Sequence, residues 1–186
     1  MKATITPAVD KYPKSMRIVH WVRALLIFGQ IWAGWTMVSL PDKVPVKFDL
    51  FYPFHKSFGL LILILALLQL ALRARTVLPK PPASLPRSEA AASKVVHMAI
   101  YVLLILVPLA GYAMSSSFTQ SDGVFFFGLY LPELLPKNDK AFEVYRLIHR
   151  VLAYSLLALV VLHVLGALKH RFVDRDEAND VLRRMV

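Results

Sequence analysis

The sequence predicts an all-α membrane protein built as an up-and-down bundle of four transmembrane helices. Of its 186 residues, 57% are hydrophobic and only 18% are charged, which is too apolar for a soluble domain of this size. Four apolar stretches come close to the roughly 20 residues that a helix needs to cross a bilayer. The length fits a single domain over residues 1–186.

The four predicted helices cover approximately residues 16–40, 54–72, 95–114 and 145–171. The first has no formal charge between Ala24 and Pro41, and the proline ends it. The second has a shorter uncharged part, so its ends are expected to lie among lipid headgroups. The third contains Pro108, which removes one backbone donor and predicts a kink that neighbouring helices can accommodate.

The segments between the predicted helices are connectors. Residues 76–87 contain four prolines and predict an extended link between the second and third helices. Residues 115–140 form the longest predicted loop, which is partly apolar and rich in turn-forming residues. Residues 172–186 mix both charge signs and predict a solvated helix or a loose end.

The distribution of charge predicts the orientation in the membrane. The net charge is +10, but the basic residues lie between long uncharged runs, so we expect a lipid bilayer and no nucleic acid as partner. Fifteen Lys and Arg residues fall on the side of the two termini and seven on the other side. Positive residues concentrate in the cytoplasm, so a multi-pass membrane protein with both termini cytoplasmic is predicted.

The absence of cysteine limits the chemistry. It excludes disulfides, thiolate-ligated metals, iron–sulfur clusters and haem attached covalently through cysteine. A metal site must therefore use histidine, carboxylates, methionine or backbone atoms. We expect no cleavable signal peptide, because the N-terminus is polar until Ile18 and the first apolar run is long enough to span.

All the histidines fall within the predicted helices or at their ends. They are His20, His55, His97, His149, His163 and His170. An ionisable side chain inside a membrane is a functional hypothesis by default. For a single histidine, an interhelical hydrogen bond or a place at the membrane surface would be the simpler explanation, so the pattern of all six matters.

His149 and His163 lie 14 residues apart in the fourth helix. On an α-helix this is an axial rise of about 21 Å and a rotation about 40° short of four turns, so both rings project from nearly one face. The predicted topology puts His149 on the outer side of the membrane, where His55 is the other histidine. Two histidines from two helices at one depth can provide both axial ligands of a haem iron.

The inner side offers His163 and a choice of partners. Depth favours His20 as the second ligand but leaves His97 open. His170 lies about 10 Å nearer the water than His163 on the same helix, too far to bind the same iron. Zinc is a poor alternative, because it requires three or four ligands clustered at short spacing and the sequence shows none.

Several motifs surround these histidines. They are His20-Trp21, residues 53–59, His97-x-x-Ile-Tyr101, Pro108-x-x-Gly111, His149, His163, residues 166–174 and residues 182–185. Together they resemble the bacterial cytochrome b561 family of four-helix di-haem membrane cytochromes, over essentially the whole chain. The resemblance implies two non-covalent haems b, one held by His20 with His163 and one by His55 with His149. His97 then becomes a neighbour of the inner haem, near a propionate. The membrane implied by this resemblance is the bacterial inner membrane.

The resemblance also implies a function. One branch of the family is a superoxide oxidase that passes electrons from superoxide through both haems to ubiquinone, next to a histidine that matches His170. Other branches are electron-carrying membrane subunits. We therefore expect transmembrane electron transfer between a periplasmic-side donor, with superoxide as a candidate, and the ubiquinone pool. The alternative is a carrier or membrane-anchor subunit for a periplasmic redox protein, so whether the chain is an enzyme stays open here.

Charged residues next to the histidines have two interpretations. Lys56 and Arg150 flank the outer pair, where they could neutralise haem propionates or attract an anion such as superoxide. Lys169 precedes His170 and is a candidate for hydrogen bonding to a quinone. Each could equally be a plain anchor at the membrane surface.

Overall fold

The computed structural model describes residues 11–82, 84–121, 123–174 and 176–186. The long helices are α1 (Lys14–Ser39), α2 (Tyr52–Ala74), α3 (Arg87–Ser117) and α4 (Asp139–Phe172). The short elements are η1 (Lys47–Phe51), β1 (Val124–Phe126), β2 (Leu129–Leu131), η2 (Glu177–Asn179) and η3 (Leu182–Arg184). The molecule is a helical bundle, as predicted.

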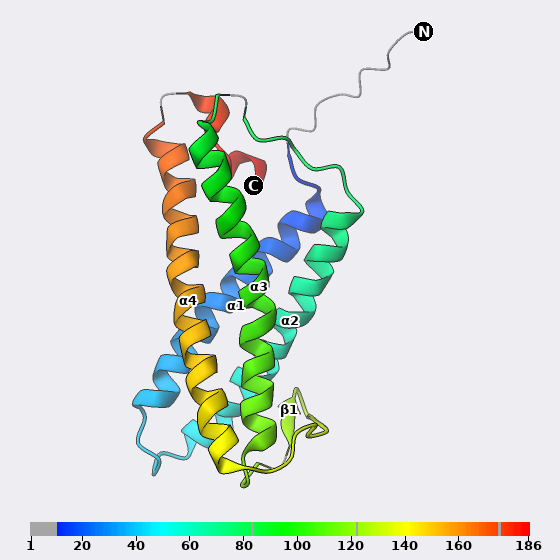
Figure 1. The fold of residues 1–186 in the computed structure, drawn as a ribbon, viewed down its shortest axis with the longest axis vertical. Coiled ribbons are helices and arrows are strands. Elements are labelled where there is room, and N and C mark those ends of the chain that lie inside the picture. The colour runs from blue at the N-terminus through cyan, green and yellow to red at the C-terminus, as the bar shows by residue number, and fades with distance from the viewer. Residues whose placement is uncertain (1–10, 83, 122, 175) are drawn as a thin grey trace.

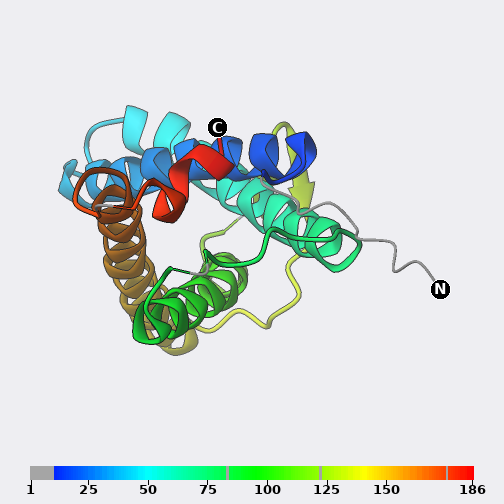
Figure 2. The ribbon, with the colours of Figure 1, turned by 90° about the horizontal axis from the view of Figure 1, so that it is seen from above.

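The long helices run alternately up and down and follow one another around the bundle axis in chain order (Figures 1 and 2). The helix α3 packs along α4, α1 packs on α2, and α2 packs on α3. The start of α1 and residue 186 lie at one end, here called the terminal end (Figure 1). The strands β1 and β2 lie at the opposite end, here called the hairpin end.

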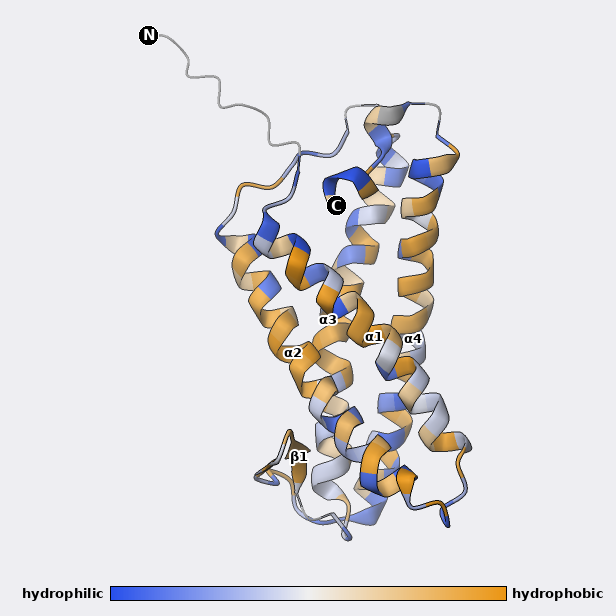
Figure 3. Cartoon of the chain, turned by 180° about the vertical axis from the view of Figure 1, so that it is seen from behind, coloured by the Kyte–Doolittle hydropathy of each residue, from blue (hydrophilic) through white to orange (hydrophobic). Residues whose placement is uncertain are grey.

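Within the described residues, three helical segments are long and apolar enough to cross a membrane: Lys47–Ala74, Arg87–Ser117 and Asp139–Phe172. Many of their large apolar side chains face outward, and Leu67, for example, is 50% exposed. Most residues along the middle of the long helices are hydrophobic, and hydrophilic residues are more frequent towards the two ends of the bundle (Figure 3). An apolar surface of this extent is stable against lipid rather than water. The chain is therefore a membrane protein.

The helix α1 is not among these three segments. Its 26 residues are about 39 Å long, enough to cross the bilayer. However, Arg23, Gln30 and the tryptophans lower its mean hydropathy. A fourth span through α1 and the cytoplasmic side of both termini stay predictions.

The helices α3 and α4 begin well before the predicted starts at residues 95 and 145. Predicting helices from apolarity misses polar first turns, which depend on capping. Before α4, the Asn138 side chain accepts hydrogen bonds from the backbone N–H groups of Lys140 and Ala141, at 3.0 and 3.1 Å. Pro108 lies inside α3 and does not end it, since the helix continues to Ser117.

The loop between α3 and α4 contains the antiparallel hairpin β1–β2, with Phe126 paired to Leu129. The tight connection needs Phe127 and Gly128 at φ angles of 45° and 95°, and glycine adopts such angles without strain. The sequence analysis predicted only an irregular loop here. It could not place the hairpin, since three-residue strands carry too little periodicity.

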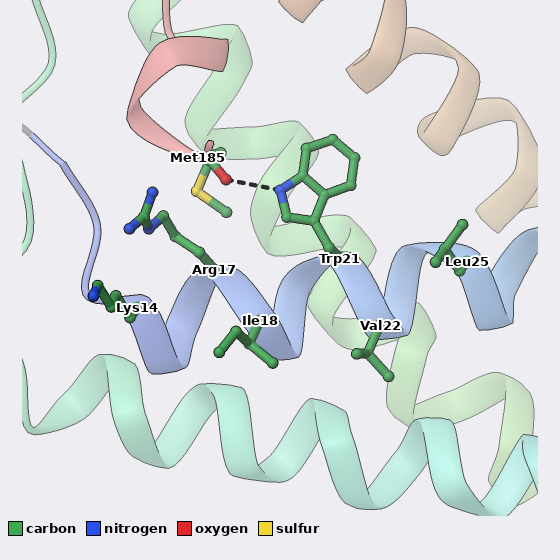
Figure 4. A pocket seen from close by; sticks show the side chains of 7 residues that line it. All are labelled: Lys14, Arg17, Ile18, Trp21, Val22, Leu25 and Met185. Atoms are coloured by element: carbon green, nitrogen blue, oxygen red, sulfur yellow. Dashed lines mark hydrogen bonds between the residues drawn. The ribbon is translucent and has the colours of Figure 1, made fainter.

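The prediction of a solvated or loose C-terminal tail is wrong. The tail folds back over the terminal end, where the indole N–H of Trp21 donates to the Met185 carbonyl at 2.7 Å (Figure 4). The backbone N–H of Tyr12 donates to the Arg184 carbonyl at 3.1 Å. The Ser84 hydroxyl donates to the Asn179 side chain at 2.9 Å. These contacts tie the start of α1 and the proline-rich connector to the tail.

The core lies halfway along the bundle and contains residues from all four long helices. Its members are Ile27, Ile62, Ala66, Leu104 and Leu156. Leu156 is seven residues from both His149 and His163, which corresponds to about 10.5 Å along the helix in each direction. The apolar core therefore separates one histidine group near each end of the bundle.

Candidate functional site

At the hairpin end, His55 and His149 face each other. Their ring centroids are 6.2 Å apart and the ring planes meet at 78°. His55 comes from the first turn of α2 and His149 from α4. Among the described residues, α4 packs along α3 but only sparsely on α1 and α2. The two rings therefore approach each other from helices whose backbones stay apart.

A backbone carbonyl orients His149. Its Nδ1 donates to the carbonyl of Val107 at 2.9 Å. Since a carbonyl only accepts, the proton must be on Nδ1, which leaves the lone pair of Nε2 free. Histidines that bind metals use this arrangement to fix the ring. A Cβ at Gly111 would lie 3.1 Å from both Cε1 and Nδ1 of His149, so glycine lets the ring rest against α3.

The helix α1 contacts His55. The Gln30 amide donates to the backbone carbonyl of His55 at 3.1 Å. Gly34 faces the His55 ring, and a Cβ there would make only an ordinary contact of 3.6 Å. The Nδ1 atom of His55 is buried and has no hydrogen-bond partner among the described residues. Buried polar atoms normally have hydrogen-bond partners. The unpartnered nitrogen of His55 is therefore consistent with a ring that binds a group from outside the chain.

At the terminal end, His163 meets both of its predicted partners. Its ring centroid is 6.3 Å from that of His20 and 4.9 Å from that of His97. The side chain of Ser93 lies 3.3 Å from Nδ1 of His97. The structure thus brings three histidines from α1, α3 and α4 together at this level.

The ring spacings can be compared with those of a metal held between two imidazoles. Each nitrogen would lie about 2 Å from the metal, on opposite sides, so the centroids would be about 6 Å apart. The spacing of His55 and His149 fits this geometry, and so does that of His20 and His163. The 4.9 Å between His97 and His163 is too short for it.

The quinone candidates lie in a polar cluster at the end of α4. His170 Nδ1 and Asp174 Oδ2 are 2.7 Å apart, and His170 Nε2 is 3.7 Å from Glu89. The Lys169 ammonium donates to Glu89 at 2.7 Å and lies 3.4 Å from Asp174. Both candidates therefore already interact with carboxylates, and the cluster joins the first turn of α3 to the end of α4.

This cluster is expected to make the folding stability depend on pH. The hydrogen bond from His170, together with Lys169, lowers the pKa of Asp174. A carboxyl group whose pKa is lowered on folding stabilises the fold at pH values above its unfolded pKa. This stability is lost as the pH falls through the folded pKa.

We therefore expect Asp174→Asn to lower the thermal unfolding midpoint at pH 7. Its difference from the native protein should shrink as pH falls below about 4. Circular dichroism in detergent measures the unfolding midpoints of the variant and the native protein at each pH, with Asp49→Asn as the control. A difference in midpoint that stays the same at every pH would contradict this prediction.

Two of the predicted charged residues lie next to the histidine pair at the hairpin end. Lys56 follows His55 and is half-buried, while Arg150 follows His149 and is exposed. That they neutralise haem propionates or attract an anion stays a prediction. The sequence analysis did not anticipate Gln30 and the Val107 carbonyl. Gln30 could have been recognised from the sequence, since a polar residue within an otherwise apolar run is a candidate for a functional contact.

Comparison with known proteins identifies the family. The profile described as prokaryotic cytochrome b561 matches residues 11–186. The chain belongs to this family. This confirms the resemblance seen in the sequence motifs.

The relatives of this b561 family member cover nearly its whole length. "Cytochrome b561 homolog 2" of Escherichia coli is 30% identical over 100% of this chain and 95% of that protein. "Probable superoxide oxidase CybB" of Yersinia pestis is 27% identical over 90% of this chain and 91% of that protein. "Cytochrome b561 homolog 1" of E. coli is 23% identical over 95% of this chain and 98% of that protein. Family membership indicates a b-type haem cytochrome of a bacterial membrane, with transmembrane electron transfer as its general activity.

Proposed function

We propose that the chain carries electrons across the bacterial inner membrane with two non-covalent haems b. His55 and His149 hold one haem, and His20 and His163 hold the other. The observation that carries this proposal is the pair of centroid separations, 6.2 and 6.3 Å, each suited to one metal between two imidazoles. Haem iron with two histidine ligands supplies one-electron redox chemistry and has no open site for oxygen.

The residues of α4 organise both sites. His149 and His163 project from nearly one face about 21 Å apart, so one rigid helix sets the separation between the two ligand pairs. The Val107 carbonyl holds the His149 ring with Nε2 free. The His97 ring packs against His163 and would position that ring without binding the metal. The apolar core around Leu156 keeps water out of the region between the pairs.

The proposed topology has four spans, with the terminal end in the cytoplasm. The up-and-down arrangement and the excess of Lys and Arg on the side of the termini support it. The hairpin end then faces the periplasm, so the His55–His149 pair is nearer the electron donor. The His20–His163 pair and the His170 cluster are nearer the cytoplasm and the acceptor.

We take superoxide as the donor and ubiquinone as the acceptor, which would make the chain a superoxide:ubiquinone oxidoreductase. Two superoxide anions each lose one electron and leave as oxygen, while one ubiquinone gains two electrons and two protons and becomes ubiquinol. Lys56 and Arg150 would attract the anion at the hairpin end. His170 and Lys169 would donate to the quinone carbonyl by exchanging a carboxylate partner for it. The name of the Yersinia pestis relative supports the choice of donor.

The second candidate function is that of a carrier or membrane-anchor subunit for a periplasmic redox protein. It is favoured by exposed apolar residues at the hairpin end. Leu129, Tyr130 and Leu134 are 64%, 65% and 73% exposed. A surface of this kind suits contact with a partner protein.

Two measurements on the purified protein test these proposals. A reduced-minus-oxidised spectrum and a haem assay should give a b-type signal and two haems per chain, and a content near zero would refute haem binding. A superoxide source with ubiquinone should then reduce the haems and form ubiquinol, and superoxide dismutase should abolish both. If the haems are present but superoxide does not reduce them faster than it dismutates, the chain is a carrier for another donor.

A further inference from the structure

Arg23 is a charged residue buried among the helices of the bundle. It lies in α1, three residues after His20, and is only 5% exposed. Ile27, one turn further along α1, belongs to the apolar core. Burying a charge in such surroundings is unfavourable unless an opposite charge accompanies it.

The described residues do not provide that opposite charge. The Nη1 atom of Arg23 is buried without a hydrogen-bond partner among them, and no carboxylate among them forms an ion pair with this guanidinium. It lies 5.5 Å from the centre of the Tyr101 ring, which is an attraction to a neutral group.

Three carboxylates that the structure describes at the terminal end have other partners. Glu89 pairs with Lys169. Asp174 pairs with His170, and Asp180 pairs with Arg171. None of these three acids pairs with Arg23, so a bound anionic group is the remaining candidate for its counter-charge.

The position of Arg23 indicates which group this is. One turn of helix separates it from His20, so the two side chains lie about 4.5 Å apart along the axis and on adjoining parts of one face. A buried, partly unpaired guanidinium therefore lies beside the pair of histidines proposed to hold the inner haem.

We propose that Arg23 is the buried counter-charge for a carboxylate of the cofactor held by His20 and His163, which for haem b is a propionate. The guanidinium has five N–H donors in a planar fork that matches a carboxylate. This inference rests on the proposed function, since it requires a haem at that pair. It makes Arg23 a positioning residue that also affects the reduction potential.

The test is a spectroscopic redox titration of the purified holoprotein with its two haems. Arg23→Gln removes a positive charge that favours the reduced haem. The equilibrium constant for reduction of the haem at His20 and His163 should therefore fall at least tenfold. This corresponds to 59 mV for a one-electron couple. The other haem should stay unchanged, and Arg23→Lys, which keeps the charge, should shift much less. Arg75→Gln is the matched control, because it removes an exposed arginine just beyond α2.

Infrared redox difference spectra of protein containing haem with ¹³C-labelled propionates show whether a carboxylate is involved. In Arg23→Gln a propionate band should shift relative to the native protein, while in Arg75→Gln it should not. Unchanged potentials, equal shifts of both haems, or a lowered potential with unchanged propionate bands would each overturn the inference. Retention of both haems in His20→Ala and His163→Ala would instead refute the proposed ligand pair, so the two failures are distinguishable.

Discussion

Replacing His149 by alanine is expected to remove one of the two haems and leave the other in place. The variant loses an axial ligand that no neighbouring side chain can replace, since His55 is its only ring partner among the described histidines. His55→Ala should have the same effect. Each variant should retain roughly half of the native b-type absorbance, because each haem has its own ligand pair. Haem content per chain and the reduced-minus-oxidised spectrum measure this.

Gly111→Ala should disturb the same haem more mildly than these variants. Its Cβ would lie 3.1 Å from the His149 ring, so the ring must move and its hydrogen bond to Val107 must weaken. Partial loss or a spectral shift of the same haem is expected, and Gly166→Ala is the control, since a Cβ there meets nothing within 4 Å. Loss of both haems in His149→Ala, or of neither, would show that the ligand pairs are wrong.

The second large effect should separate His20 from His97. His20→Ala is expected to lose the haem at the terminal end, while His97→Ala should keep it with an altered spectrum or potential. The reason is spacing: His20 is 6.3 Å from His163, which leaves room for a metal between the rings, whereas His97 is 4.9 Å away. Haem stoichiometry of the two purified variants decides between them.

His163→Ala serves as the reference for this comparison. It should lose the same haem as His20→Ala, and combining the two substitutions should cause no further loss. If His97→Ala loses the haem and His20→Ala does not, His97 is the ligand and the proposed pair is wrong. If both lose it, the packing of His97 on His163 is essential for holding the haem.

Local features of the sequence were sufficient for the helical architecture. Apolar runs of membrane length predict helices because an isolated backbone in lipid must satisfy its own hydrogen bonds. The 14-residue spacing of His149 and His163 likewise fixes their separation along one helix, whatever the rest of the chain does. The predicted pairing of His55 with His149 needed only that both lie at one depth, and the structure places their rings together.

The polar ends of the helices depend on less visible features. The early start of α4 depends on the Asn138 cap, and the tail is held by contacts such as that of Trp21 with Met185. A cap contributes one hydrogen bond or two, and a docked tail depends on residues distant in the sequence. Neither changes the hydrophobic pattern from which the helices were predicted.

By itself, the sequence determined that this protein is a helical membrane bundle with histidines grouped towards its two ends. Only the tertiary structure decided how the rings meet: which of His20 and His97 leaves space beside His163, and that the Val107 carbonyl holds His149. It also showed that Arg23 is buried without an acidic partner among the described residues. The physical reason is that spacing along one helix is set by backbone geometry. Distances between helices depend instead on how each helix is rotated and tilted in the packed bundle.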